Sequence, residues 1–400
     1  MPKLYPLKGT IQNYAWGGNH FIPELLGIKA VDKKYAEYWL GAHTKSPSII
    51  TDSTGDQTLD VFLKSDLTNS LGTKIAKKFG RLPFLFKVLD VSEMLSIQVH
   101  PTKFEAEKGF EFENKKGIPL NAPHRNYKDD NHKPEIMVAL SDFWLLHGFL
   151  PKGQLTKVLK NTPEFVELFS VFEEKGYFGL YKKVMMQSVE ETNQVLQPLI
   201  NRILPLYKLG KLQKSNPNYW AAKAIDSAKD KTVLDKGIYS IYFFNIVKIK
   251  KGEAIFQDAG IPHAYLEGQN MELMANSDNV LRGGLTPKHV DVPELLKHMI
   301  FEETLPNVMR GELQADGIER IYKSPAPDFE LSQIELHSAK RYQSKTKTAQ
   351  IIIIISGEAE VAEGNKVLTV NKGDAVFITA EAEYQISTNS KAMIYKATAP

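Results

Sequence analysis

The sequence contains no cysteine among its 400 residues. Disulfides, thiolate metal ligands and cysteine nucleophiles are therefore excluded, and a transition metal would have to be held by histidine and by carboxylate or amide oxygens. The chain also lacks an excess of one charge, since 50 Lys and Arg residues face 47 Asp and Glu residues. A formal net charge of +3 predicts neither a nucleic-acid partner nor a membrane partner.

Long hydrophobic runs are missing as well. The longest aliphatic run is "IIIII" near the C-terminus, far short of a membrane span, and the N-terminal "MPKLYPLKGTIQNYAWGG" has no hydrophobic signal-peptide core. The composition is that of an ordinary globular protein, with enough residues for two or three domains. These features predict a cytoplasmic location.

Strand-like and helix-like patterns divide the chain into four predicted parts. Short β-branched and aromatic runs dominate residues 1–150, whereas residues 151–235 place apolar side chains at three- and four-residue spacing, typical of helices. The strand pattern is expected to return with "GIYSIYFFNIVKIK" and to fill 236–320, interrupted by a helical stretch at 287–304. Residues 321–400 are again rich in strand patterns. The chain is thus predicted to be mainly β with a helical subdomain.

An internal repeat gives the β regions an architecture. "KGEAIFQDAGIPHAY" from Lys251 aligns with "KGDAVFITAEAEYQI" from Lys372, and in this alignment His263 falls on Tyr384. A lysine–glycine turn followed by a strand and a second turn is typical of a double-stranded β-helix barrel. Two copies predict two barrels, of which the C-terminal one, with Tyr384 in place of His263, is expected to hold no metal.

The segment "LSIQVHP" raises the question of function. Leu95, Ile97 and Val99 alternate with Ser96, Gln98 and His100, so a strand here would carry polar tips on one face. Polar strand faces usually meet water, and the alternation alone leaves open whether this face is solvated or holds a ligand.

Two other segments contain metal-capable residues. In "NHKPE", Glu135 begins an apolar run, where an unpaired carboxylate would be costly to bury, although a salt bridge with a neighbour would also explain it. In "IPHAYLEG", His263 follows a proline-fixed turn. If these segments meet, Gln98, His100, Glu135 and His263 supply two imidazoles, a carboxylate and an amide oxygen, a set that suits zinc.

A further segment, "MELMANSDNVLRGGLTPK", places Glu272 in an apolar run and Arg282 before two glycines. Read alone, it is an ordinary surface loop with a salt-bridged arginine. A glycine-flanked arginine can nevertheless approach a bound anion closely.

These segments together resemble the type I mannose-6-phosphate isomerase family. "QNYAWGG", "YAEYWLGAH", "LPFLFKVLDVSEMLSIQVHP", "NYKDDNHKPE", "PHAY" and "NSDNVLRGGLTPK" follow the family pattern in order, from about residue 10 to 295. The resemblance implies two cupin-like barrels of the jelly-roll type, a helical domain and one Zn²⁺ per chain. It also implies a sugar phosphate as substrate.

The resemblance also assigns residues by position. The implied zinc ligands are Gln98, His100, Glu135 and His263. The implied catalytic residue is Arg282, and the implied pocket residues are Ser96, Lys87, Lys133, Glu272, Tyr265 and Trp16.

The implied reaction interconverts mannose 6-phosphate and fructose 6-phosphate through an enediol, in mannose metabolism and GDP-mannose supply. The base is left open among His132, Lys133, Glu272 and Asp278, because a base needs reach and a suitable pKa rather than a particular residue type. The alternatives are a cupin oxygenase and a non-catalytic or differently specific sugar-phosphate-binding protein. A monomer is favoured over an oligomer.

Overall fold

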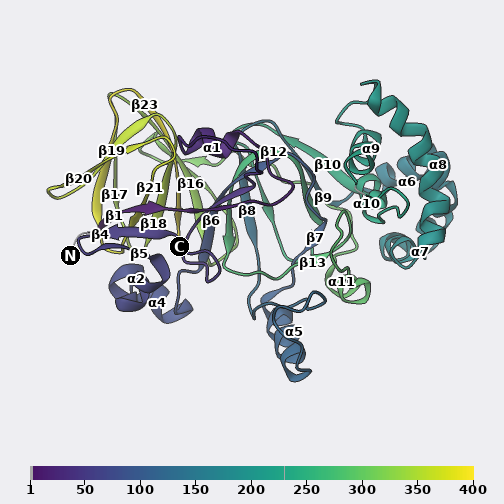
Figure 1. Ribbon diagram of the computed structural model, residues 1–400, viewed down its shortest axis with the longest axis horizontal. Helices are drawn as coiled ribbons and strands as arrows, with labels where there is room; N and C mark the ends of the chain where they lie inside the picture. Colours follow the sequence, from purple (N-terminus) through teal and green to yellow (C-terminus); the bar gives the residue numbers. More distant parts are fainter. Residues whose placement is uncertain (1–2, 229) are drawn as a thin grey trace.

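The protein is mainly β, with its helices gathered at one end and along one side (Figure 1). The computed structural model describes residues 3–228 and 230–400. The predicted ranges 1–150 and 151–235 therefore include residues 1, 2 and 229, which lie outside the described residues.

The sheet that carries most predicted site residues has ten strands. Its path is β10 (Phe244–Ile249), β9 (Phe143–Phe149), β12 (His263–Ala275), β6 (Phe84–Val91), β3 (Glu37–Leu40) and β2 (Thr10–Gln12). Off this path lie β7 (Gln98–Val99), β8 (Glu135–Ala139), β11 (Ala254–Gln257) and β13 (Leu281–Arg282). Strand β12 is long enough to pair with β9 and β7 in its first half and with β6 and β8 in its second.

Two further sheets form the left part of Figure 1. The nine-stranded sheet runs in the order β14 (Glu312–Leu313), β15 (Glu319–Tyr322), β16 (Glu330–His337), β23 (Lys391–Thr398), β18 (Gln350–Ser356), β21 (Ala375–Ile378), β1 (Leu4–Lys8), β4 (Ile49–Asp52) and β5 (Gly55–Thr58). The four-stranded sheet is β17 (Arg341–Lys345), β22 (Glu383–Ser387), β19 (Glu358–Glu363) and β20 (Lys366–Asn371). Strands from the N-terminal part of the chain thus complete a C-terminal sheet.

The helices fall into three groups. Beside the sheets lie α1 (Phe21–Leu25), α2 (Leu59–Ser65), α3 (Leu67–Leu71) and α4 (Thr73–Phe79). At the right end of Figure 1 lie α6 (Lys152–Asn161), the 3-10 turn η1 (Pro163–Phe165), α7 (Val166–Met185), α8 (Val189–Lys208), α9 (Pro217–Ser227) and α10 (Gly237–Phe243). The remaining two, α5 (Lys103–Lys115) and α11 (Val292–His298), lie close together at the lower edge. No helix of the described residues is long and apolar enough to span a membrane.

One sequence-based expectation about the strands is wrong. "GIYSIYF", expected to begin a strand, is helix α10, and all seven of its residues are buried. A short apolar run fits a buried helix as well as a buried strand, and here packing of Tyr239 and Tyr242 against Phe165 in the helical core favours the helix. The helical stretch expected at 287–304 is shorter in the structure, where only α11 (Val292–His298) is helical.

The internal repeat has the same local structure in both copies. Gly252 and Gly373 have positive φ angles of 83° and 91°, and each lies within a turn closed by a 2.9 Å backbone hydrogen bond. In both turns the acidic side chain, Glu253 or Asp374, accepts a 2.8 Å hydrogen bond from the backbone N–H three residues earlier. Strands β11 and β21 then begin at equivalent positions. The repeat therefore reflects a shared turn that aims two strands in the same way.

Candidate metal centre and active site

Three of the predicted metal ligands meet in the interior of the ten-stranded sheet. Glu135 begins β8, His263 begins β12 and His100 follows β7. His100 Nε2 lies 3.4 Å from Glu135 Oε1, and His263 Nε2 lies 3.4 Å from Glu135 Oε2. All three side chains are buried, and their ligand atoms lie within 4.8 Å of one another. The structure thus brings together, from distant parts of the chain, residues that the sequence could connect only by hypothesis.

The hydrogen bonds of the two imidazoles prepare them for a metal. His100 Nδ1 lies 2.9 Å from the Asn279 carbonyl oxygen, and His263 Nδ1 lies 2.9 Å from that of Ile261. A carbonyl only accepts, so both Nδ1 atoms carry the proton and both Nε2 atoms carry a lone pair. Neither buried Nε2 has a hydrogen-bond partner. Two unpartnered lone pairs beside one carboxylate fit a zinc ion.

The charges at this centre favour metal-competent protonation states. Burial and the nearby Lys133 ammonium lower the pKa of His100 to about 4, so its imidazole is neutral at physiological pH. Burial would raise the pKa of Glu135, but Lys133 and the two imidazoles lower it well below its ordinary value. Lys133 Nζ lies 2.7 Å from Glu135 Oε1. Metal binding requires neutral imidazole and ionised carboxylate, and the pKa shifts of His100 and Glu135 favour these states.

Strand register places Gln98 and Arg282 beside these ligands. Gln98 lies opposite His263 in the β7–β12 pair and opposite Arg282 in the β7–β13 pair. Residues directly opposite each other in an antiparallel pair share one face, so all three side chains leave the strands on the same side. Only two residues of "LSIQVHP", Gln98 and Val99, form a strand, yet this short pairing suffices to fix the register.

A second buried network connects four other predicted or related residues. Lys87 Nζ lies 2.9 Å from Glu272 Oε2 and 3.4 Å from Glu37 Oε2, and the Tyr265 hydroxyl donates to Glu272 Oε1 at 2.8 Å. Burial raises the pKa of Glu272, although Lys87 opposes the shift. Burial would lower the pKa of Lys87, but Glu272 and Glu37 outweigh it and raise the pKa. Lys87 is therefore a cation held by two carboxylates.

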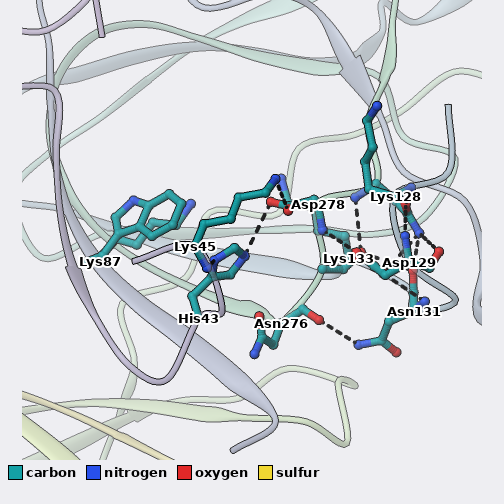
Figure 2. A network of polar contacts seen from close by, with 12 residues as sticks. His43, Lys45, Lys87, Lys128, Asp129, Asn131, Lys133, Asn276 and Asp278 are labelled. Atoms are coloured by element: carbon teal, nitrogen blue, oxygen red, sulfur yellow. Dashed lines mark hydrogen bonds and ion pairs between the residues drawn. The ribbon is translucent and has the colours of Figure 1, made fainter. Parts of the chain in front are cut away.

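Asp278 belongs to a separate polar group. Figure 2 shows His43 and Lys45 pointing at its carboxylate, with His43 Nε2 3.5 Å from Oδ1 and Lys45 Nζ 2.6 Å from Oδ2. Burial would raise the pKa of Asp278, but its contacts with His43 and Lys45 lower it far below the ordinary value. Asp278 is thus a firmly ionised, poorly basic carboxylate.

The loop that bears Asp278 is locked to the loop that bears Lys133. Asn279 Oδ1 accepts from the backbone N–H of Lys128 at 2.7 Å, and Asn279 Nδ2 donates to the carbonyls of Asp129 and Asn131 at 2.8 Å each. Figure 2 shows a further bond between the two loops, in which the Asn131 amide donates to the Asn276 carbonyl at 3.2 Å. Because the carbonyl of Asn279 also holds His100, this polar lock fixes a metal ligand indirectly.

Arg282 lies among cations rather than carboxylates. Burial lowers the pKa of Arg282. Burial and Arg282 lower the pKa of Lys288. Burial also lowers the pKa of Lys128; Glu113 opposes that shift, and Arg282 is among the cations that add to it. Within 3–228 and 230–400, no carboxylate lies within 4.0 Å of Arg282, Lys288 or Lys128. Cations gathered without counter-charge are the arrangement that an anionic ligand completes.

The helical region holds the segment that follows Arg282. The Asp235 carboxylate accepts from the backbone N–H groups of Leu285 and Thr286, at 2.8 Å and 3.0 Å. Gly284 has a φ of 113°, and a Cβ there would lie 2.5 Å from the backbone nitrogen of Gly237. Glycine at this position therefore allows the loop to lie directly on helix α10.

The remaining predicted residues are placed as follows. His132 Nε2 lies 2.7 Å from Oδ2 of Asp328, a residue of the loop before β16. This contact links His132 to the C-terminal part of the chain. Ser96 precedes Ile97, whose backbone pairs with Gly283 and Gly284. Trp16 is partly buried and packs on the apolar cluster that contains Tyr265.

His298 joins α11 to α5 near this site and gives a prediction about stability. Its Nδ1 lies 3.2 Å from Glu105 Oε2 and its Nε2 3.1 Å from Glu294 Oε1. Burial would lower the pKa of His298, but the two carboxylates raise it above the ordinary 6.5. A raised pKa contributes stability that is fully present below pH 6.5 and is lost as pH rises through the folded pKa.

We expect His298→Gln to lower the thermal unfolding midpoint by about 2 °C at pH ~6. The difference from the unmodified chain should narrow at pH ~9, and calorimetry at both pH values measures it. A difference in unfolding midpoint that grows as the pH rises would contradict a stabilising charge on His298. His337→Gln, at an exposed position, serves as the control.

Several residues of the site were missed from the sequence. Glu37 and His43 lie in "YAEYWLGAH" and Lys288 ends "NSDNVLRGGLTPK", but these motifs assigned them no role, and Asp235 lies outside the quoted motifs. Lys288 is the last residue of "RGGLTPK", and its electrostatic interaction with Arg282 is the feature that identifies it.

Comparisons with known proteins agree with this geometry. The family described as phosphomannose isomerase type I, catalytic domain, matches residues 4–152, and the family described as mannose-6-phosphate isomerase, cupin domain, matches residues 319–395. The mannose-6-phosphate isomerase of Escherichia coli K12 is 36% identical over 383 residues, covering 94% of this chain and 95% of that protein. The human enzyme of the same name is 33% identical over 415 residues, covering 95% and 94%.

Solved structures show the same similarity. Salmonella typhimurium mannose 6-phosphate isomerase, bound to fructose 6-phosphate and zinc, matches with a TM-score of 0.89 and 33% identity over 100% of both chains. A mannose 6-phosphate isomerase described as bound with zinc and yttrium matches with a TM-score of 0.89, 33% identity and the same full coverage.

Proposed function

The chain belongs to the type I mannose-6-phosphate isomerase family, and we infer that it is a zinc-dependent isomerase that interconverts mannose 6-phosphate and fructose 6-phosphate. The observation that carries this inference is the buried His100–Glu135–His263 group with two unpartnered Nε2 lone pairs. A non-catalytic or differently specific binding protein is not favoured, because relatives named as this isomerase match over nearly the whole chain.

We propose that Gln98, His100, Glu135 and His263 hold one zinc ion. When bound, zinc supplies positive charge that stabilises the negative charge developing on the sugar oxygens as a proton leaves. Lys133, paired with Glu135 at 2.7 Å, adds a fixed cation at the same centre. The chain's remaining tasks are to move the proton and to hold the phosphate.

We propose Glu272 as the base that moves the proton between C2 and C1 through an enediol. Its pKa is raised by burial, which brings a carboxylate closer to useful basicity. The other candidates are less suitable: the lowered pKa of Asp278 makes it a weak base. His132 is engaged by Asp328, and Lys133 is held as a cation by Glu135. Tyr265 and Lys87 orient the Glu272 carboxylate by hydrogen bonds.

We propose that Arg282 and Lys288 bind the phosphate. Arg282 is half-buried and Lys288 is exposed, and neither has a carboxylate within 4.0 Å among the described residues, whereas Lys87 and Lys133 are already paired with buried carboxylates. The phosphate would supply the missing counter-charge. Ser96 and Trp16 remain proposed pocket residues.

Lys288→Met should raise KM for mannose 6-phosphate by about tenfold to about a hundredfold with little change in kcat. The charge lost contacts a part of the substrate that does not react, so binding rather than chemistry suffers. Steady-state kinetics at low and high salt measure the effect. Lys248→Met, which removes a lysine paired with Asp142, is the control and should change neither constant. A fall in kcat with unchanged KM would contradict phosphate binding by Lys288.

The test of the function itself is conversion of mannose 6-phosphate to fructose 6-phosphate before chelation, after chelation and after zinc is restored. We expect activity to disappear with the chelator and to return with zinc. Activity that persists after the metal has been stripped would overturn the zinc site. No turnover by a zinc-loaded sample would overturn the isomerase assignment.

We further propose two cupin-like jelly-roll barrels, with the domain ranges 1–150, 151–235, 236–320 and 321–400. The shared turn geometry of the two repeat copies supports two barrels. In the C-terminal copy, Lys396 Nζ lies 2.6 Å from the buried Glu319, which supports the proposal that this barrel uses an internal ion pair in place of a metal. A cytoplasmic monomer without nucleic-acid or membrane partners completes the proposal.

A further inference from the structure

Gln257, at the end of β11, is fully buried, and neither atom of its side-chain amide has a hydrogen-bond partner. Burying an unpaired amide costs free energy of the order of 1–3 kcal/mol. Gln257 is the last residue of the repeat segment "KGEAIFQ". A buried position at the end of a strand could be filled equally well by an apolar side chain. An amide at this position therefore needs an explanation.

The position of Gln257 is next to a proposed metal ligand. In the β11–β8 pair, Gln257 lies directly opposite Glu135. Opposite residues of an antiparallel pair share one face, with Cβ atoms about 4.5–5.5 Å apart. The side chain of Gln257 thus leaves its strand on the same side as that of Glu135, although the amide makes no hydrogen bond to the carboxylate in this structure.

The Glu135 carboxylate is short of hydrogen-bond donors. Lys133 donates to Oε1, whereas the imidazole nitrogens near both oxygens carry lone pairs. Across the described part of the chain, Lys133 is the one donor within 3.5 Å of this carboxylate. A buried carboxylate has room for about four hydrogen bonds, so an amide N–H facing it has an acceptor available.

A second acceptor lies beside residue 257. His147 is buried and lies opposite His263 in the β9–β12 pair, and its Nε2 is 3.3 Å from the carbonyl oxygen of Phe256. This contact places the proton on Nε2 and leaves Nδ1 as an acceptor without a partner. The amide of Gln257 is thus unpaired in a region where Glu135 and His147 each have an acceptor that is not filled.

We propose that Gln257 is a positioning residue for the metal site: its amide, which makes no hydrogen bond in this structure, would donate to Glu135 when the site is loaded and so hold the carboxylate in the orientation that binds zinc. This inference rests on the proposed ligand set. Hydrogen bonds to a ligating carboxylate fix its orientation, and their loss weakens metal affinity by about 10- to 100-fold. The amide acts through Glu135 and does not itself touch the metal or the substrate.

The test compares two nearly isosteric replacements, Gln257→Met and Asn270→Leu. Asn270 is a matched control, because its amide is also fully buried and unpartnered but lies opposite Leu89 and Ala139, away from the ligands. Zinc affinity is measured by competition with a chromophoric chelator. The visible absorption of the Co²⁺-loaded proteins reports the ligand geometry without any substrate.

We expect Gln257→Met to bind zinc about 10- to 100-fold more weakly and to shift the Co²⁺ spectrum, with Asn270→Leu unchanged in both. If Gln257→Met keeps zinc affinity within about twofold and an unshifted Co²⁺ spectrum, the positioning role is overturned. Should Gln257→Met fail to fold, Gln257→Leu replaces it and the same two readouts decide. If the unmodified chain binds no zinc, the ligand set of the proposed function fails, which is distinguishable from failure of Gln257 alone.

Discussion

His263→Ala is expected to lose zinc and to lower kcat/KM for mannose 6-phosphate by about a thousandfold or more. The variant removes one of two imidazoles whose unpartnered lone pairs converge on Glu135, so the remaining ligands hold the ion weakly. Without the metal, several kcal/mol of stabilisation of the developing charge disappear, and each 1.36 kcal/mol is worth a factor of ten in rate.

The measurement pairs metal analysis with steady-state kinetics. His337→Ala is the control for loss of a histidine, because this side chain is more than half exposed and lies at the end of β16. We expect the control to keep one zinc per chain and full activity. If His263→Ala keeps stoichiometric zinc, the ligand set is incorrect, and if it loses zinc yet retains turnover, the metal has no part in the reaction.

Candidate metal ligands could be named from the sequence, but only one of them for a physical reason. Glu135 begins an apolar run, where a carboxylate is costly to bury without a partner, whereas His100 and His263 were singled out together with it by the family motifs in which they lie. What no local pattern contained was the contact between them, which depends on pairing β12 with both β7 and β8 across more than a hundred residues of chain.

Other features could not be predicted, because they are set by tertiary contacts. Glu37 looks like an ordinary strand residue, and only the pairing of β3 with β6 brings it to Lys87. Helix α10 reads as a strand in sequence because burial on all sides removes the helical period. The proposed choice among four possible bases also needed the structure, since it depends on whether burial or cationic partners dominate the pKa of each carboxylate.

The carboxylates of Asp278 and Glu272 lie in contrasting environments, and this contrast predicts a large effect of replacing Glu272. Asp278, held by His43 and Lys45, has a lowered pKa, whereas burial raises that of Glu272. Environments that push the pKa values of two acids apart commonly separate a structural carboxylate from a catalytic one. Glu272→Gln is therefore expected to lower kcat by about a hundred- to ten-thousandfold, with zinc content unchanged.

Solvent isotope exchange distinguishes two roles of Glu272, that of the base that transfers the proton and that of an ion-pair partner of Lys87. Proton abstraction through an enediol places solvent deuterium on the product carbon, and Glu272→Gln should reduce exchange and turnover together. The matched control is Glu37→Gln, which removes the other buried carboxylate on Lys87 and should have the smaller effect. Equal losses in the two variants would assign Glu272 to holding Lys87. Undiminished deuterium incorporation by Glu272→Gln would assign the proton to another base, because only a group that exchanges with solvent can introduce the label.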